Sequence, residues 1–242
     1  VSADGKRSGT YDDRIVMTNK PSANGVMNSI VGLASAYPAL KNYFPQEAER
    51  SLKNALMLWN KYVGEGDNGV RGAIELYYAT GDEKFKNNFM PAILKQIDAL
   101  GKSEENADNN NRNRRNAGPN MSQILRVYDM LPADAKAKVD AAIPAYVERL
   151  AAVGSENPYS VPISGGGWGG NTQVISNSFN AYLVWKQFPE LVDPDMVLKG
   201  LNYLYGNHPY NNLSFVTGVG VGTKKVAYGN NRADYNVIPG GI

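Results

Sequence analysis

The sequence predicts an all-α protein made of stacked helical hairpins. Apolar residues recur at three- and four-residue steps in eight segments of the 242-residue chain, which is the spacing of one buried helix face. Most of these segments begin at a capping residue or a proline and end at a glycine or a proline. No convincing pair of strands separates them, and no fixed-period repeat indicates a regular solenoid. A hairpin cannot bury its apolar face alone, so we expect each one to pack against its neighbours.

Local signals place the first two helices. Ser22 can cap the first helix, and Pro38 is expected to end it. Pro45 opens the second helix at a position where its missing N–H is tolerated, and Gly64 is expected to stop it. In chain order, the eight expected helices cover residues 22–38, 45–63, 68–80, 82–100, 120–131, 133–153, 171–188 and 193–206.

The later helices show similar signals. Gly81 is expected to close the third helix and Asp82 to cap the fourth, in which Pro91 should cause a kink or a split. Pro144 is expected to interrupt the sixth helix. The eighth helix begins with Asp193 as its N-cap, followed directly by a proline.

Two aperiodic stretches lie between these helices. Residues 101–119 are polar and form the clearest surface loop, and a Gly-Ser-Pro loop at 154–170 holds Trp168 between glycines. Neither stretch clearly separates two domains, so we expect residues 1–242 to form one domain. The chain begins with Val1 and shows no signal peptide, so it looks like a processed or truncated piece.

Composition excludes several functional classes. The net charge of +2 gives no indication of nucleic acid or of an anionic membrane, and no apolar run is long enough to span a bilayer. The absence of cysteine excludes thiolate metal sites, and a single histidine excludes zinc motifs built on a His pair. We interpret that histidine, His208, as packing at a helix end rather than as a ligand. An enzyme of this composition would rely on carboxylates and substrate-binding side chains.

The last 42 residues, from Leu201 to Ile242, are the most informative part of the chain. After a short helix they lose all periodicity and bring Gly, Asn, Tyr and Thr together around Arg232. Long irregular segments in compact domains are usually functional. This composition suits a site that binds polyhydroxylated ligands. Asp234 is the only carboxylate in this loop, and alone it cannot supply both the acid and the base of glycoside hydrolysis.

Several stretches together carry a resemblance to a known family. GGWGGNTQVISNSFNAYLVWKQ is similar to a Trp-Gly-x-Asn-x-Gln helix start, and LNYLYGNHPYNNLSFVTGVG to a Leu-Gly-x-Asn/His-Pro…Ser-Phe-Val-Thr-Gly signature. KPSANGVMNSIVGLASAY and RGAIELYYATGDEKF match more generic segments. In this order they resemble the catalytic domain of glycoside hydrolase family 9, the cellulase-type six-hairpin glycosidases. The resemblance implies an (α/α)6 barrel, here an incomplete toroid of hairpins with a long irregular C-terminal segment.

The resemblance also implies a set of substrate-binding residues. Trp168 falls where the family places an aromatic sugar platform, and Arg232 matches the arginine of its His-His-Arg motif. Asn230 and Asn231 stand where the family has the two histidines. Each residue has a structural alternative: Trp168 folded onto the core, Arg232 pinning the loop, and Asn230 serving a turn.

The family's catalytic base and acid have no counterpart in this chain. The base belongs to an Asp-Ala-Gly-Asp motif upstream of Val1, and the acid to a helix beyond Ile242. The resemblance therefore implies no catalytic residue here. Calcium accompanies the family, but no stretch resembles a dedicated calcium loop, so we expect no metal and no cofactor. Among the other candidates, Glu75 is expected to be a partly buried structural carboxylate. Four tyrosines at helical spacing are expected mostly in the core: Tyr77, Tyr78, Tyr128 and Tyr146.

Taken together, these expectations describe part of a secreted or periplasmic glycosidase. It would cleave a β-1,4-linked glucan or related plant polysaccharide with inversion, and its partners would be the polysaccharide and the remainder of its own catalytic domain. On this view the chain alone is inactive. Two alternatives stay open: a non-catalytic carbohydrate-binding or scaffold protein on the same helices, and a glycosidase or polysaccharide lyase of another helical-toroid family.

Overall fold

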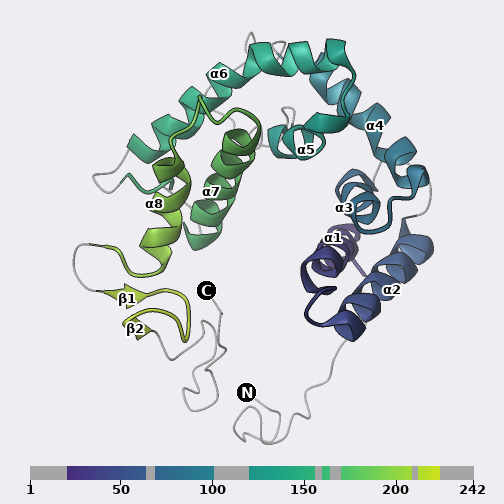
Figure 1. Ribbon diagram of the computed structural model, residues 1–242, viewed down its shortest axis with the longest axis horizontal. Helices are drawn as coiled ribbons and strands as arrows, with labels where there is room; N and C mark the ends of the chain where they lie inside the picture. The colour runs from purple at the N-terminus through teal and green to yellow at the C-terminus, as the bar shows by residue number, and fades with distance from the viewer. Residues whose placement is uncertain are drawn as a thin grey trace, which may run out of the picture. The chain divides into compact units, whose positions relative to one another are not determined.

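The computed structural model describes residues 21–63, 69–100, 120–155, 160–163, 170–208 and 212–223 (Figure 1). The chain divides into two compact units, with the boundary between Ala142 and Ile143 inside one long helix. No described helix is both long and apolar enough to cross a membrane.

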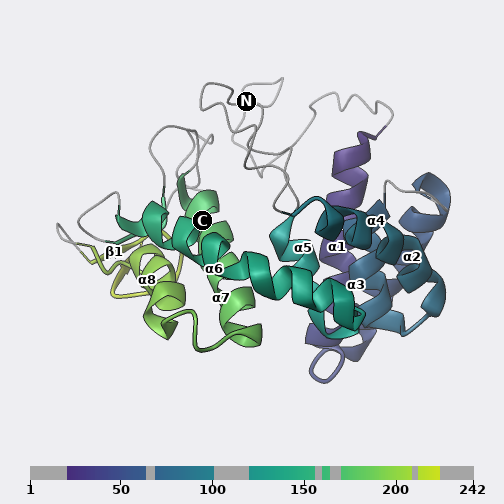
Figure 2. The ribbon, with the colours of Figure 1, turned by 90° about the horizontal axis from the view of Figure 1, so that it is seen from above.

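The first unit is a set of antiparallel helices. It contains α1 (Ala23–Leu40), α2 (Pro45–Tyr62), α3 (Val70–Thr80), α4 (Glu83–Asp98), α5 (Met121–Arg126), the 3-10 turn η4 (Tyr128–Met130) and the start of α6 (Ala133–Ser155). Helix α1 packs against α2 and α3, and α3 packs against α4; Figures 1 and 2 show these neighbours side by side. In the core between them, the rings of Trp59 and Phe85 meet edge to face with their centroids 5.5 Å apart.

Three of the predicted helix termini are confirmed by their capping geometry. The Ser22 hydroxyl accepts a hydrogen bond from the Gly25 N–H at 3.1 Å, and the Asp82 carboxylate accepts one from the Lys84 N–H at 3.0 Å. Gly81 ends α3 with φ of 70°, a left-handed conformation in which a Cβ atom is strained. The predicted stop at Gly64 lies outside the described residues.

The helix end expected at Pro38, the interruption expected at Pro144 and the split expected at Pro91 were wrong, while the alternative of a kink at Pro91 stays a prediction. Pro38 lies inside α1, which continues to Leu40, and neither Pro91 nor Pro144 breaks its helix. A proline removes one N–H and leaves one carbonyl of the preceding turn without its helical donor. All three prolines are exposed, so water can reach that turn and the helices continue.

The prediction of one helix over 120–131 was also wrong in its second half. Helix α5 ends at Arg126 and a tighter 3-10 turn follows. The turn shifts the buried face, because Val127 becomes fully buried while Tyr128 points outward and donates a hydrogen bond to Asp140 at 2.6 Å. None of the four tyrosines expected mostly in the core is fully buried: three are partly buried, Tyr77, Tyr128 and Tyr146, and Tyr78 is exposed.

The second unit contains the end of α6, α7 (Gly170–Gln187) and α8 (Pro194–Leu204). Helices α7 and α8 pack side by side, as both views show (Figures 1 and 2). A pair of two-residue parallel strands follows, β1 (Leu213–Ser214) and β2 (Gly222–Thr223), with Leu213 opposite Gly222. The sequence did not indicate this pair, because two residues are too few to show a period. Apart from it, the described residues confirm the all-α prediction.

Candidate functional site

The three predicted substrate-binding residues, Trp168, Asn230 and Arg232, lie outside the described residues, as does Asp234. The structure therefore does not test their roles. It does describe the chain next to them: residues 160–163 and Gly170 flank the segment with Trp168, and residues 212–223 lead into the segment with Asn230 and Arg232.

These flanking stretches meet in one hydrophobic cluster, which we call the platform. It brings together the loop at 160–163, the first turns of α7, the last turn of α8 and the segment after β1. Its buried members are Val161, Val174, Leu204 and Val216, with Ile163, Tyr203 and Phe215 packed against them. Approach is close at Gly170, where an added Cβ would lie 2.5 Å from the Cδ1 atom of Ile163. Both segments with predicted site residues thus leave the same packed core.

A buried hydroxyl holds the terminal segment to α8. Ser214 is 0% exposed, and its Oγ accepts a hydrogen bond from the Val216 N–H at 3.0 Å. The same hydroxyl lies 3.3 Å from the carbonyl oxygen of Leu204 and 3.2 Å from that of Val216, so its one proton is donated to one of them. The Phe215 N–H also donates to the Leu204 carbonyl at 2.8 Å. The Ser-Phe-Val-Thr-Gly stretch is therefore an anchor.

His208 completes this anchor. Its Nε2 lies 2.9 Å from the carbonyl oxygen of Leu213, which can only accept, so Nε2 carries the proton. The imidazole stacks on the Phe215 ring with centroids 5.2 Å apart and an interplanar angle of 28°. The interpretation of His208 as packing at the helix end is confirmed. Next to it, Gly206 has φ of 104°, and a Cβ there would lie 2.7 Å from the Asn212 carbonyl oxygen.

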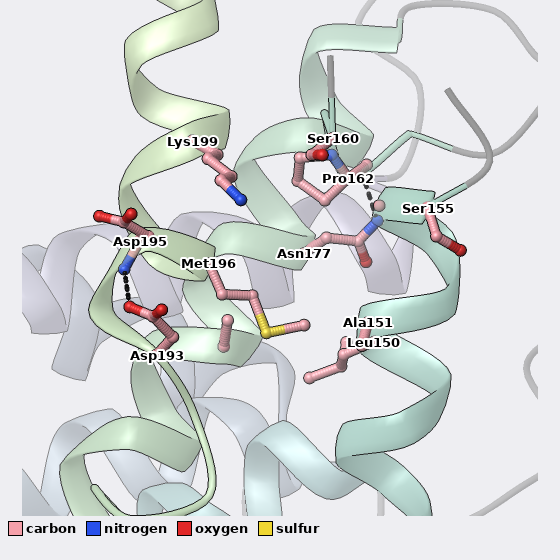
Figure 3. A pocket seen from close by; sticks show the side chains of 12 residues that line it. Leu150, Ala151, Ser155, Ser160, Pro162, Asn177, Asp193, Asp195, Met196 and Lys199 are labelled. Carbon is pink, nitrogen blue, oxygen red and sulfur yellow. Dashed lines mark hydrogen bonds between the residues drawn. The ribbon is translucent and has the colours of Figure 1, made fainter. Parts of the chain in front are cut away.

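A pocket of about 230 Å³ lies beside the platform, between α6, the loop at 160–163, α7 and α8 (Figure 3). Asn177 connects it to the platform loop, because its Nδ2 donates to the Pro162 carbonyl at 2.7 Å. Asp193 and Asp195 lie together on one side of the pocket, at the start of α8, and the Asp193 carboxylate accepts the Asp195 N–H at 2.9 Å. Lys199 lines the pocket one helical turn further on.

This pocket does not have the chemistry of a glycosidase centre. Glycoside hydrolysis needs an acid and a base on opposite sides of the bond that breaks. Asp193 and Asp195 both come from the first turn of α8, both are exposed, and one of them already serves as the helix cap. Within the described part of the chain, no group of three or more His, Cys, Asp or Glu side chains could hold a metal ion.

The structural interpretation of Glu75 is confirmed. Its two carboxylate oxygens accept hydrogen bonds from Nε and Nη2 of Arg126, each at 3.1 Å. The guanidinium carbon of Arg126 lies 4.1 Å from the centre of the Tyr78 ring, and the Tyr78 hydroxyl donates to the Arg126 carbonyl. Burial raises the pKa of Tyr78 above its usual value of 10. Glu75 therefore ties α3 to α5 through a paired guanidinium.

Sequence reasoning missed several residues that shape this region. Ser214 was noted only as part of the Ser-Phe-Val-Thr-Gly motif, and no role was predicted for Asn177 or Pro162. For Ser214 only a general signal was present: a serine outside a helix can bond nearby backbone groups through its hydroxyl. Nothing in the sequence indicates the bond between Asn177 and Pro162.

Comparisons with known proteins follow from this fold. No protein-family model and no curated protein sequence matches the chain. Solved structures do match, among them two endoglucanases and a cellulase. A thermostable endoglucanase from Alicyclobacillus acidocaldarius aligns with 95% of this chain and 46% of its own, at 16% identity and a TM-score of 0.59.

Two further structures give the same result. A metagenome-derived family 9 endoglucanase aligns with 90% of this chain and 43% of its own, at 16% identity and a TM-score of 0.56. A cellulase of C. cellulolyticum aligns with 88% of this chain and 50% of its own, at 18% identity and a TM-score of 0.50. The chain therefore spans about half the length of these proteins. The resemblance to family 9 and the (α/α)6 class are confirmed as a shared fold.

Proposed function

We propose that this chain forms part of a glycoside hydrolase that cleaves a β-1,4-linked glucan or related plant polysaccharide. Its role in that enzyme is to supply walls of the substrate cleft. The platform carries the proposal, because the two segments that resemble the family's substrate-binding stretches leave one packed core. The shared fold supports it, and one of the similar cellulases was solved in complex with cellobiose.

In this proposal the chain binds substrate and other parts of the domain perform the proton transfers. The indole of Trp168 offers a flat apolar face and one N–H donor to a pyranose ring. Arg232 offers a planar fork of donors to neighbouring hydroxyls, and Asn230 donates and accepts without titrating. An inverting mechanism further needs an acid and a base with a water between them. We place both in parts of the domain beyond this chain, which by itself is then inactive.

Calorimetric binding of cellotetraose to the purified chain tests the assignment. We expect Trp168→Ala and Arg232→Ala each to weaken binding at least tenfold, which is about 1.4 kcal/mol. Trp185→Ala and Arg71→Ala are matched controls, since Trp185 is exposed on α7 and Arg71 is exposed on α3. Both controls should bind within twofold of the parent chain. Unchanged binding in both test variants, or hydrolysis of cellotetraose by this chain alone, would contradict the proposal.

One observation favours a second function, a non-catalytic carbohydrate-binding or scaffold protein. Asn230 and Asn231 replace the histidines of the family motif, so no side chain at these positions can transfer a proton near neutral pH. The complete reading frame separates the two functions. An upstream Asp-Ala-Gly-Asp and a downstream helix with glutamate support the enzyme, and their absence supports the binding protein.

The same reading frame tests the proposed location. A polymeric glucan is too large to enter a cell, so we propose that the protein is secreted or periplasmic. A signal peptide at the start of the reading frame is the expected result.

A further inference from the structure

Helix α7 carries a row of large apolar side chains on its exposed face, which we call the aromatic stripe: Ile175, Phe179, Tyr182 and Trp185. Each is between 37% and 50% exposed. The rings form a continuous series, with centroids 6.4 Å apart from Phe179 to Tyr182 and 6.2 Å apart from Tyr182 to Trp185. The spacing of three and four residues keeps all four side chains on one side of the helix.

The buried residues of α7 are also apolar, apart from Ser178. Its buried residues include Val174, Ala181 and Val184, which face the core of the unit. The only charged residue of this 18-residue helix is Lys186, in its last turn. Large apolar side chains that stand in a continuous row on an exposed helix face mark a surface that a partner covers.

Helix α2 shows what a solvent-facing helix of this protein looks like. It has the same length of 18 residues and keeps one apolar side, but its other positions carry five charged residues. These are Glu47, Glu49, Arg50, Lys53 and Lys61. The exposed face of α7, with its continuous row of rings, therefore differs from the exposed face of α2. It is a local departure that calls for a covering partner.

The chemistry of the stripe points to another helix as that partner. A saccharide site needs polar groups placed around a concave surface, and the stripe is a convex row of side chains without charge until Lys186. The apolar face of a second helix fits such a row, because its side chains interdigitate with residues spaced three and four apart. The similar solved structures contain additional chain that could supply such a helix, because this chain aligns with only 43% to 50% of the length of the three compared above.

We propose that the aromatic stripe is the docking surface for an apolar helix from the part of the domain beyond this chain. This inference rests on the proposed function, because it takes the chain to be part of a larger helical toroid. In the completed protein, the stripe would be buried between two helices. The aromatic stripe, whose exposed rings resemble a sugar-binding surface, would then be a contact surface between two parts of one domain.

Cysteine accessibility tests this assignment, because the chain has no cysteine of its own. A single cysteine is introduced by Tyr182→Cys, and its rate of reaction with a maleimide is measured in two polypeptides: this chain and the product of the complete reading frame. Phe179→Cys provides a second position on the stripe. Lys53→Cys, on the exposed face of α2, is the matched control. We expect both stripe positions to react at least tenfold more slowly in the longer polypeptide, and the control to react equally in both.

The other outcomes overturn the inference. Equal rates in both polypeptides, or a reading frame without further helices, would show that no such helix covers the stripe. If the stripe cysteines already react slowly in this chain, another part of the same chain covers the stripe. If light scattering also gives the mass of a dimer, a second copy covers it. Loss of cellotetraose binding in Trp185→Ala would assign the stripe to sugar. A longer polypeptide that protects the stripe but leaves β-glucans intact would contradict the proposed function alone.

Discussion

Replacing Ser214 by alanine tests whether one buried hydroxyl stabilises the segment that follows α8. The variant removes the acceptor of the Val216 N–H, which lies 3.0 Å from the Ser214 Oγ. The Leu204 carbonyl keeps its bond from the Phe215 N–H at 2.8 Å, so only one backbone group loses its partner. A buried donor without an acceptor costs about 1–3 kcal/mol. We therefore expect the free energy of unfolding to fall by about 2 kcal/mol, and the Val216 amide to exchange roughly thirtyfold faster.

Ser178→Ala is the matched control for this prediction. Ser178 is also buried, at 3% exposure, but its Oγ has no hydrogen-bond partner among the described residues. Removing that hydroxyl should leave the free energy of unfolding within about 0.5 kcal/mol of the parent chain, or raise it. Urea unfolding and amide hydrogen exchange measure both variants. If the two variants have equal stability and the Val216 amide exchanges as in the parent chain, Ser214 does not anchor the segment.

Two further predictions concern the first unit. Arg126→Ala leaves the half-buried Glu75 carboxylate without its donors and should cost about 1–3 kcal/mol, whereas Lys138→Ala breaks an exposed ion pair and should cost less than about 1 kcal/mol. Urea unfolding compares them, and equal effects would refute the argument from burial. Burial and the hydrogen bond to Asp140 raise the pKa of Tyr128 from 10.0 to about 12. Because the pKa is higher in the folded state, this stabilisation is complete below pH 10 and is lost as the pH rises toward 12. Asp140→Ala should shift the tyrosinate absorbance titration to lower pH, and an unchanged titration would exclude the role given to Asp140.

The fold class and the helix caps could be predicted because they depend on neighbouring residues. Ser22 and Asp82 cap the helices that directly follow them, and Gly81 adopts the left-handed turn expected after a helix. Each signal acts within one helical turn, so a single sequence contains it fully. The expected helix breaks at prolines failed because a proline in the sequence indicates only the local loss of one backbone hydrogen bond. Whether a helix continues past Pro91 depends on solvent exposure and on the packing of the whole helix.

The candidate site shows the same division. The motif at 213–218 could be recognised by its similarity to the family signature, and its position after the eighth helix indicated that the terminal segment is important. That Ser214 is buried, or that its hydroxyl meets the carbonyl of Leu204, could not be predicted, because the two residues meet only after the chain has turned back on α8. The ion pair between Arg126 and Glu75 joins positions 51 residues apart and is equally invisible to a local pattern.

By itself the sequence determined eight helices, most of their termini and a resemblance to the helical glycosidases, since spacing, capping and motif order are properties of the chain. Only the tertiary structure decided which faces of those helices are covered. Helix α7 has large apolar residues in its aromatic stripe and also at Val174 and Val184, yet the stripe is exposed while the two valines are buried. The reason is that burial depends on which segments pack together, and hydrophobic contact has no fixed distance along the chain.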